Sequence, residues 1–195
     1  MKGGKDCFVL NTGASIPAVG LGTWQTDGDL CKAAVKTALD IGYRHLDCAH
    51  LYGNEGEVGQ AITETLSKKS NLRREDLFVT SKILCTTTNN AKKRVEASVF
   101  VSLKNLSLSY LDLYLIHWPA QGQVGDATDP PYYKQEKSPP RFKEAWRAME
   151  GLVEKGLVRA IGVSNFNISQ LEELLSFAKI VPAVNQVSSI TLCRV

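Results

Sequence analysis

Three polar residues, Asp47, Lys82 and His117, are spaced 35 residues apart and could together transfer protons. Each of them ends a run that predicts a buried strand, at 43–47, 77–82 and 111–117. A strand, a helix and two short loops need about 30 or more residues, so the spacing fits successive βα units. The carboxyl ends of neighbouring parallel strands lie side by side, and chemistry in such folds is found there. We therefore expect an acid, an ammonium and an imidazole to meet at one edge of the sheet.

A tyrosine, Tyr52, follows the strand that ends at Asp47 by five residues. A phenol is a weak acid at neutral pH, but a nearby ammonium such as that of Lys82 favours the phenolate and improves proton exchange. Asp47 would hold that ammonium in place, and His117 could orient a carbonyl oxygen. Taken alone, each residue could instead have a purely structural role, in a salt bridge, as a packed ring or as a half-buried imidazole. Together they predict proton transfer to a carbonyl group while another molecule supplies hydride.

The elements that must position these residues alternate between strand and helix. Turn residues at 11–13 predict a hairpin of residues 7–10 and 15–19, which is followed by a strand at 19–22. In a helix from Asp27 or Asp29 to Ile41, we expect the core-facing residues to be Leu30, Ala33, Ala34, Ala38 and Leu39. Helical periodicity and caps also predict helices at about 54–68, 89–106, 142–155 and 169–178, with strands at 160–163 and 183–186 and a long polar loop at 120–140.

This order of elements predicts an α/β fold of the (β/α)8 TIM-barrel type with an N-terminal β-hairpin. About six βα units are present, so we expect the barrel to be incomplete. The strands are apolar on both faces, as is typical of parallel strands covered by helices. An open doubly wound sheet is the alternative, but Gly20 and Gly22 lack the third glycine of a dinucleotide-binding fingerprint.

Composition excludes several classes of protein. The chain of 195 residues is 44% apolar and 22% charged, and its net charge of +3 is too small to indicate nucleic-acid binding. Its five cysteines are scattered without CxxC spacing, so neither a disulfide framework nor a zinc site is indicated, and a reducing compartment fits best. No signal peptide or membrane-spanning run is visible. We expect a cytoplasmic protein that binds neither membrane nor nucleic acid.

Seven stretches of the sequence resemble the aldo-keto reductase family, in particular its plant-type members. They follow the family order across nearly the whole chain, at 20–24, 42–47, 51–55, 79–82, 110–119, 161–166 and 185–187. The resemblance implies a (β/α)8 barrel that reduces a small-molecule aldehyde or ketone with NADP(H). It also implies that Tyr52 is the proton donor, that Lys82 and Asp47 adjust its acidity, and that His117 orients the carbonyl.

The resemblance further implies where cofactor and substrate bind. The nicotinamide carboxamide would be hydrogen-bonded by Ser164, Asn165 and Gln186. The cofactor would also lie against Gly22, Thr23, Trp24 and Asp47, and the substrate pocket would be lined by Trp24, His117 and Trp118. Ordinary aromatic packing is an alternative for Trp118. The cofactor would carry the hydride chemistry, while the protein orients the reactants and supplies the proton.

Beyond Val187 the sequence no longer resembles the family. We expect residues 1–187 to form a partial aldo-keto reductase barrel and residues 188–195 a divergent tail, in a C-terminally truncated member. A second departure is Leu84, where relatives carry a tryptophan. Two hypotheses follow, an NADPH-dependent reductase or a catalytically impaired isoform that acts in binding or regulation or has no function. Sugar or phosphate isomerisation is disfavoured because no late-strand phosphate site is visible.

Overall fold

A computed structural model describes residues 6–68, 71–83, 91–119, 122–124, 133–135 and 142–187. An antiparallel hairpin, β1 (Cys7–Val9) and β2 (Ser15–Pro17), precedes the main sheet, as the turn residues predicted. Six parallel strands then pair in the order in which they occur along the chain. They are β3 (Leu21–Gly22), β4 (His45–Asp47), β5 (Phe78–Ile83), β6 (Leu111–Ile116), β9 (Val158–Ser164) and β10 (Asn185–Gln186).

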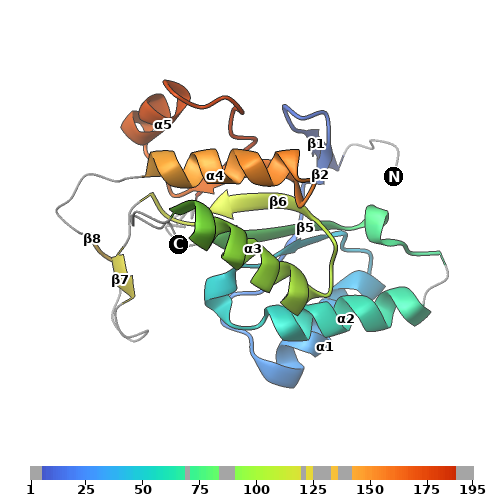
Figure 1. Ribbon diagram of the computed structural model, residues 1–195. Helices are drawn as coiled ribbons and strands as arrows, with labels where there is room; N and C mark the ends of the chain where they lie inside the picture. The colour runs from blue at the N-terminus through green and yellow to red at the C-terminus, as the bar shows by residue number, and fades with distance from the viewer. Residues whose placement is uncertain are drawn as a thin grey trace, which may run out of the picture.

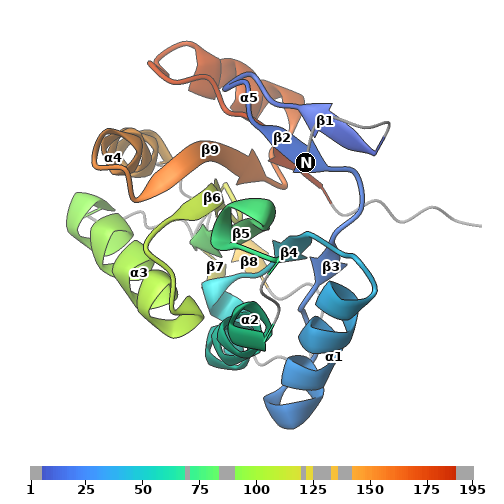
Figure 2. The same cartoon turned by 90° about the vertical axis from the view of Figure 1, so that its right-hand side faces the viewer.

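Helices connect consecutive strands and cover the outer face of the sheet. Figures 1 and 2 show α1 to α4 arranged along one side of the strands, with the hairpin at one end. The helices are α1 (Gly28–Asp40), α2 (Glu55–Lys68), α3 (Ala91–Leu106), α4 (Phe142–Glu154) and α5 (Ile168–Leu175), and two 3₁₀ turns are η1 (His50–Tyr52) and η2 (Arg74–Asp76). This arrangement is a parallel α/β half-barrel, which confirms the predicted fold class.

The two faces of each strand pack against different partners. Phe78, Leu113 and Ala160 form a small cluster with Leu10, which precedes the hairpin turn. Their neighbours in the strands instead join the large core shared with the helices, among them Val79, Ile83, Tyr114, Ile116, Ile161 and Val163. Side chains alternate between the faces of a strand, so Lys82 shares the inner face with Phe78. Both faces of the strands are therefore buried, which explains their apolar sequences.

The structure corrects two predictions. In α1 the buried residues are Cys31, Val35, Ala38 and Leu39. Leu30 is 66% exposed, so its placement on the core face was wrong, as was that of Ala33. The region predicted as one long loop contains a short antiparallel pair, β7 (Gly122–Val124) and β8 (Tyr133–Gln135).

Four other predictions fall on residues that the structure does not describe. They concern the rest of that loop, the start of α3 at 89–90, Leu84 and the tail at 188–195. Among the helices that the structure describes, none is long and apolar enough to cross a membrane.

Candidate active site

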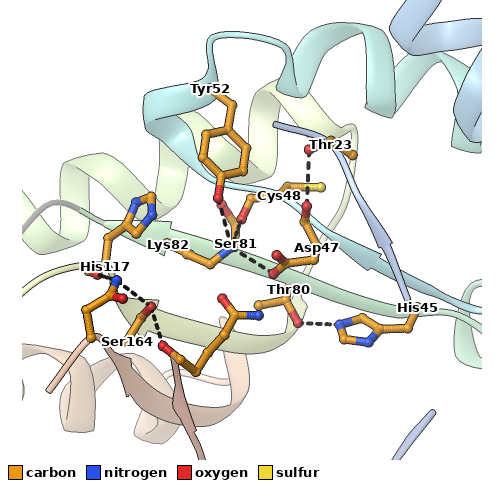
Figure 3. A network of polar contacts seen from close by, with 12 residues as sticks. Thr23, His45, Asp47, Cys48, Tyr52, Thr80, Ser81, Lys82, His117 and Ser164 are labelled. Atoms are coloured by element: carbon orange, nitrogen blue, oxygen red, sulfur yellow. Dashed lines mark hydrogen bonds and ion pairs between the residues drawn. The ribbon is translucent and has the colours of Figure 1, made fainter. Parts of the chain in front are cut away.

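Lys82 lies at the centre of the polar cluster on the inner face of the sheet. It is 1% exposed, and its ammonium donates to Asp47 Oδ1 at 2.7 Å and to the Cys48 carbonyl at 2.9 Å. A third, longer contact of 3.5 Å joins Lys82 Nζ to the hydroxyl of Tyr52. Figure 3 shows the Tyr52 hydroxyl directed toward this ammonium, with Asp47 beside it. The three donors of Lys82 are thus aimed at an acid, a carbonyl and a phenol.

The turn η1 places Tyr52 over the end of the sheet. Its backbone N–H donates to the Ala49 carbonyl, and Gly53 ends the turn in the left-handed region at φ 72°. The Tyr52 ring lies edge-on to the ring of His117, with 5.7 Å between centroids. The structure therefore brings together all four residues that the sequence proposed for proton transfer.

His117 follows β6 and is held by backbone contacts of neighbouring strands. Its N–H donates to the Ile83 carbonyl at 2.8 Å, and its side chain is buried. Burial, and then the positive charge of Lys82, lower the pKa of the imidazole to about 4, although Asp47 opposes this shift. The ring is consequently neutral at neutral pH. In the described part of the chain, His117 Nδ1 is buried and has no hydrogen-bond partner.

Three further predicted residues meet at the carboxyl ends of β9 and β10. The Asn165 amide donates to the His117 carbonyl at 2.9 Å and to Ser164 Oγ at 3.0 Å. Ser164 in turn donates to the Gln186 carbonyl at 2.7 Å. Asn165 has φ 63°, a left-handed conformation that asparagine adopts more readily than most residues. These contacts join the ends of β6, β9 and β10 into one surface beside His117.

The other side of the site is formed by the end of β3. Gly22 pairs in register with Asp47, and the backbone N–H and hydroxyl of Thr23 both donate to the Asp47 carbonyl at 3.1 Å. The next residue, Trp24, is 55% exposed. Trp118 is partly buried, and its ring stacks on that of His117 with 6.4 Å between the ring centroids. The Trp118 ring thus borders the polar cluster, Trp24 lies in the loop that follows β3, and the contact of either tryptophan with a ligand stays a prediction.

Burial also decides which nearby groups are chemically silent. Cys48 is fully buried, and this burial raises the pKa of its thiol far above the ordinary value. Because the thiolate is the reactive form of cysteine, Cys48 is unsuited to nucleophilic chemistry here. Its contribution to the site is the backbone carbonyl that accepts from Lys82.

Sequence reasoning assigned no role to two buried polar residues behind Tyr52. Glu55, the first residue of α2, is 2% exposed and accepts a hydrogen bond from Ser81 Oγ at 2.7 Å. Its other oxygen lies 3.6 Å from His50 Nδ1, and this contact raises the pKa of His50. Asn54 is equally buried. An acidic residue at a helix N-terminus usually complements the helix dipole at the surface, so the sequence pattern did not reveal this burial.

Comparison with known proteins identifies relatives of this chain. The sequence profile of the Aldo/keto reductase family matches residues 18–194. Aldo-keto reductase family 1 member A1 of Bos taurus is 47% identical over 186 residues, which cover 93% of this chain and 56% of that protein. Aldo-keto reductase family 1 member A1-A of Danio rerio is 49% identical over 182 residues, covering 92% and 56%. The chain thus spans little more than half the length of these relatives, which are animal proteins and do not support the predicted plant-type detail.

Solved structures show the same arrangement of elements. The aldose reductase of Schistosoma japonicum superposes with a TM-score of 0.81 at 43% identity, covering 94% of this chain and 60% of that one. An aldo-keto reductase of Bombyx mori in complex with NADP superposes with a TM-score of 0.80 at 38% identity, covering 94% and 58%.

Proposed function

Because the chain belongs to the aldo/keto reductase family, we propose that it reduces aldehydes or ketones to alcohols with NADPH. The observation that carries the proposal is the contact of the Tyr52 hydroxyl with Lys82 Nζ at 3.5 Å, beside the 2.7 Å pair of Lys82 and Asp47. Hydrogen bonds of catalytic groups are often long before substrate binds. A phenol next to a buried ammonium is suited to give a proton to a carbonyl oxygen.

Side chains at the ends of β9 and β10 support the cofactor proposal. Both N–H groups of the Asn165 amide are used, by the His117 carbonyl and Ser164 Oγ. No described residue hydrogen-bonds to Asn165 Oδ1 or to the side-chain amide of Gln186. Two amides with spare capacity fit a carboxamide, which needs both a donor and an acceptor. Ser164, Asn165 and Gln186 would hold the nicotinamide there, with Gly22, Thr23, Trp24 and Asp47 along the rest of the cofactor.

The residues would then divide the reaction between them. NADPH, when bound there, would supply the hydride that reduces the carbonyl carbon. His117, neutral because of its lowered pKa, would donate a hydrogen bond that orients the carbonyl oxygen. Tyr52 would release its hydroxyl proton to that oxygen, which completes the alcohol, and Lys82 would stabilise the phenolate that remains. Trp24 and Trp118 would form apolar walls of the substrate pocket.

The proposal is tested with Tyr52→Phe, which removes only the phenolic oxygen. We expect kcat to fall by a factor of about 10² to 10⁴, the usual contribution of general acid catalysis, with an unchanged circular dichroism spectrum. Tyr110→Phe is the matched control, because Tyr110 precedes β6 at the opposite end of the strand and packs between Arg74 and Arg159. Full turnover by Tyr52→Phe would exclude the proposed proton donor.

Binding of NADPH separates this proposal from the alternative of a catalytically impaired binding or regulatory protein. We expect NADPH to quench the intrinsic tryptophan fluorescence of the 195-residue chain. Saturable quenching together with turnover supports the reductase. The absence of both quenching and turnover favours the alternative. The scattered cysteines suit a reducing compartment, and we extend the proposal to a cytoplasmic location.

A further inference from the structure

Asn54 lies two residues after Tyr52 and makes two short hydrogen bonds to another loop. The side chain is 2% exposed, and Nδ2 donates to the Thr23 carbonyl at 2.7 Å and to the Thr26 carbonyl at 2.6 Å. Both N–H groups of the amide are thereby used. Asn54 Oδ1 is buried and has no hydrogen-bond partner among the described residues. The contribution of this side chain is therefore its pair of donors.

The loop that Asn54 holds is a constrained turn that carries Trp24. Gln25 at its centre has φ 58°, in the left-handed region that residues other than glycine rarely adopt. The Thr26 hydroxyl closes the turn by donating to the Thr23 carbonyl at 2.8 Å. Unfavourable backbone conformations persist where the surroundings over-determine them. Here the Asn54 amide binds the carbonyls at both ends of the turn.

The same loop is fixed to the sheet through Thr23, whose N–H and hydroxyl donate to the Asp47 carbonyl. The turn is thus held on one side by Asp47, which pairs with Lys82, and on the other by Asn54, which lies two residues after Tyr52. Trp24 is 55% exposed next to these contacts. A change in the position of this loop would move the indole relative to the Tyr52 hydroxyl.

We propose that Asn54 is a positioning residue that fixes the Trp24 loop relative to Tyr52 and thereby determines which carbonyl substrates fit. Asn54 touches neither cofactor nor substrate in this proposal; it acts through Trp24. The specificity part rests on the proposed reductase function, whereas the positioning part concerns this chain with or without turnover. On this proposal, a bulky carbonyl compound would contact the Trp24 indole, whereas a small one would not.

The first experiment measures the Trp24 environment without activity. The chain has three tryptophans, so labelling with 5-fluorotryptophan gives three ¹⁹F resonances, and Trp24→Phe assigns one of them. In Asn54→Ala and Asn54→Asp we expect the Trp24 resonance to shift or broaden, while that of the core residue Trp146 stays unchanged. The aspartate cannot donate and sets a carboxylate against two carbonyls. If either variant fails to fold, Asn54→Ser, which keeps one donor, takes its place.

The matched control is Asn11→Ala. Asn11 Nδ2 also donates to two backbone carbonyls, those of Val181 and Pro182 at 3.1 and 3.4 Å, but it lies in the hairpin turn between β1 and β2. This variant loses the same type of contacts and should leave the Trp24 resonance unchanged. A Trp24 resonance that is unaffected in the folded Asn54 variants, or equally affected in Asn11→Ala, overturns the proposal.

The second experiment compares KM for a bulky aromatic aldehyde and for a small aliphatic aldehyde. We expect Asn54→Ala to raise KM for the bulky substrate about tenfold relative to the small one, within the range by which pocket contacts discriminate. The kcat for the small aldehyde should change less than twofold. Equal changes for both substrates indicate a merely structural role and overturn the specificity part. If the unmodified chain shows no turnover, the proposed function fails, and the ¹⁹F result alone decides the positioning part.

Discussion

The ammonium of Lys82 lies 2.7 Å from a carboxylate oxygen of Asp47, and the two side chains are 1% and 20% exposed. A buried ammonium is costly unless it is paired and hydrogen-bonded. Asp47 and the Cys48 carbonyl meet this need, and together they aim the same ammonium at Tyr52. The ion pair therefore links the stability of the inner face to the geometry proposed for proton transfer.

The two partners of this pair are predicted to respond differently to substitution. Lys82→Met keeps most of the side-chain volume but removes the charge, so kcat should fall at least about 10²-fold while the protein stays folded. Asp47→Asn leaves the ammonium buried without its counter-ion and should lower the free energy of unfolding by about 3–5 kcal/mol. Urea denaturation measures the second effect. Wild-type stability of Asp47→Asn would show that the pair contributes nothing to the fold.

The lowered pKa of His117 predicts a loss of stability in mild acid. The unfolded imidazole has a pKa near 6.5 and the folded one about 4, so between these values the unfolded state binds the additional proton. Stability must then fall as pH decreases through this window, by up to about 3 kcal/mol in total. In His117→Asn this contribution is absent. Its unfolding free energy, measured in urea, should therefore depend less steeply on pH between about 6.5 and 4.

An NMR titration checks the same assignment one ring at a time, because the chain has only three histidines. The His117 ring should titrate near pH 4, and His45, whose pKa is also lowered by burial, should titrate below its ordinary range. The titration midpoint of His50 should instead lie above its ordinary range, because its contact with Glu55 raises the pKa. A His117 midpoint near 6.5 contradicts the assignment.

The convergence of the site could be predicted because it depends on strand ends. Asp47 ends β4, Lys82 is the last residue but one of β5, and His117 directly follows β6. The spacing of βα units brings residues at strand ends to one edge of the sheet, independently of the sequences of the helices. Which face they share is a matter of register: Lys82 pairs with Leu115, so His117 lies two residues further on the same face. The register depends on contacts between strands and was not visible in the sequence.

Other features depended on contacts that periodicity does not encode. The helical pattern of α1 contains several alanines, whose small side chains distinguish the faces poorly, and Leu30 proved exposed. The hydrogen bond of Glu55 to Ser81 joins residues 26 positions apart, and that of Asn54 to Thr26 joins residues 28 apart. Both residues lie within the stretch 51–55 that resembles the aldo-keto reductase family, but their burial follows from the packing of the start of α2 against two other segments.

Glu55→Gln is predicted to change the titration of His50 while preserving most of the packing. The amide oxygen can still accept from Ser81, but the hydrogen bond to the carboxylate, and then its negative charge, which raise the pKa of His50, are lost, so that pKa should fall. A raised pKa contributes stability below the unfolded value and loses it as pH rises through the folded value. The variant should therefore be less stable than wild type in mild acid, by no more than about 1 kcal/mol because His50 is half exposed, and equal to it in alkali. An unchanged His50 titration by NMR contradicts this prediction.

Two glycines of α2 predict opposite effects of the same substitution. A Cβ at Gly59 would lie 2.7 Å from Leu106 Cα, at the end of α3, because the two helix backbones approach closely there. Gly59→Ala should therefore force the helices apart and destabilise the protein by about 1–3 kcal/mol. A Cβ at Gly56, one turn earlier, meets nothing within 4 Å, so Gly56→Ala should stabilise the helix by up to about 1 kcal/mol. Thermal unfolding of both variants tests this pair, and equal shifts in Tm would mean that α2 does not pack on α3 through Gly59.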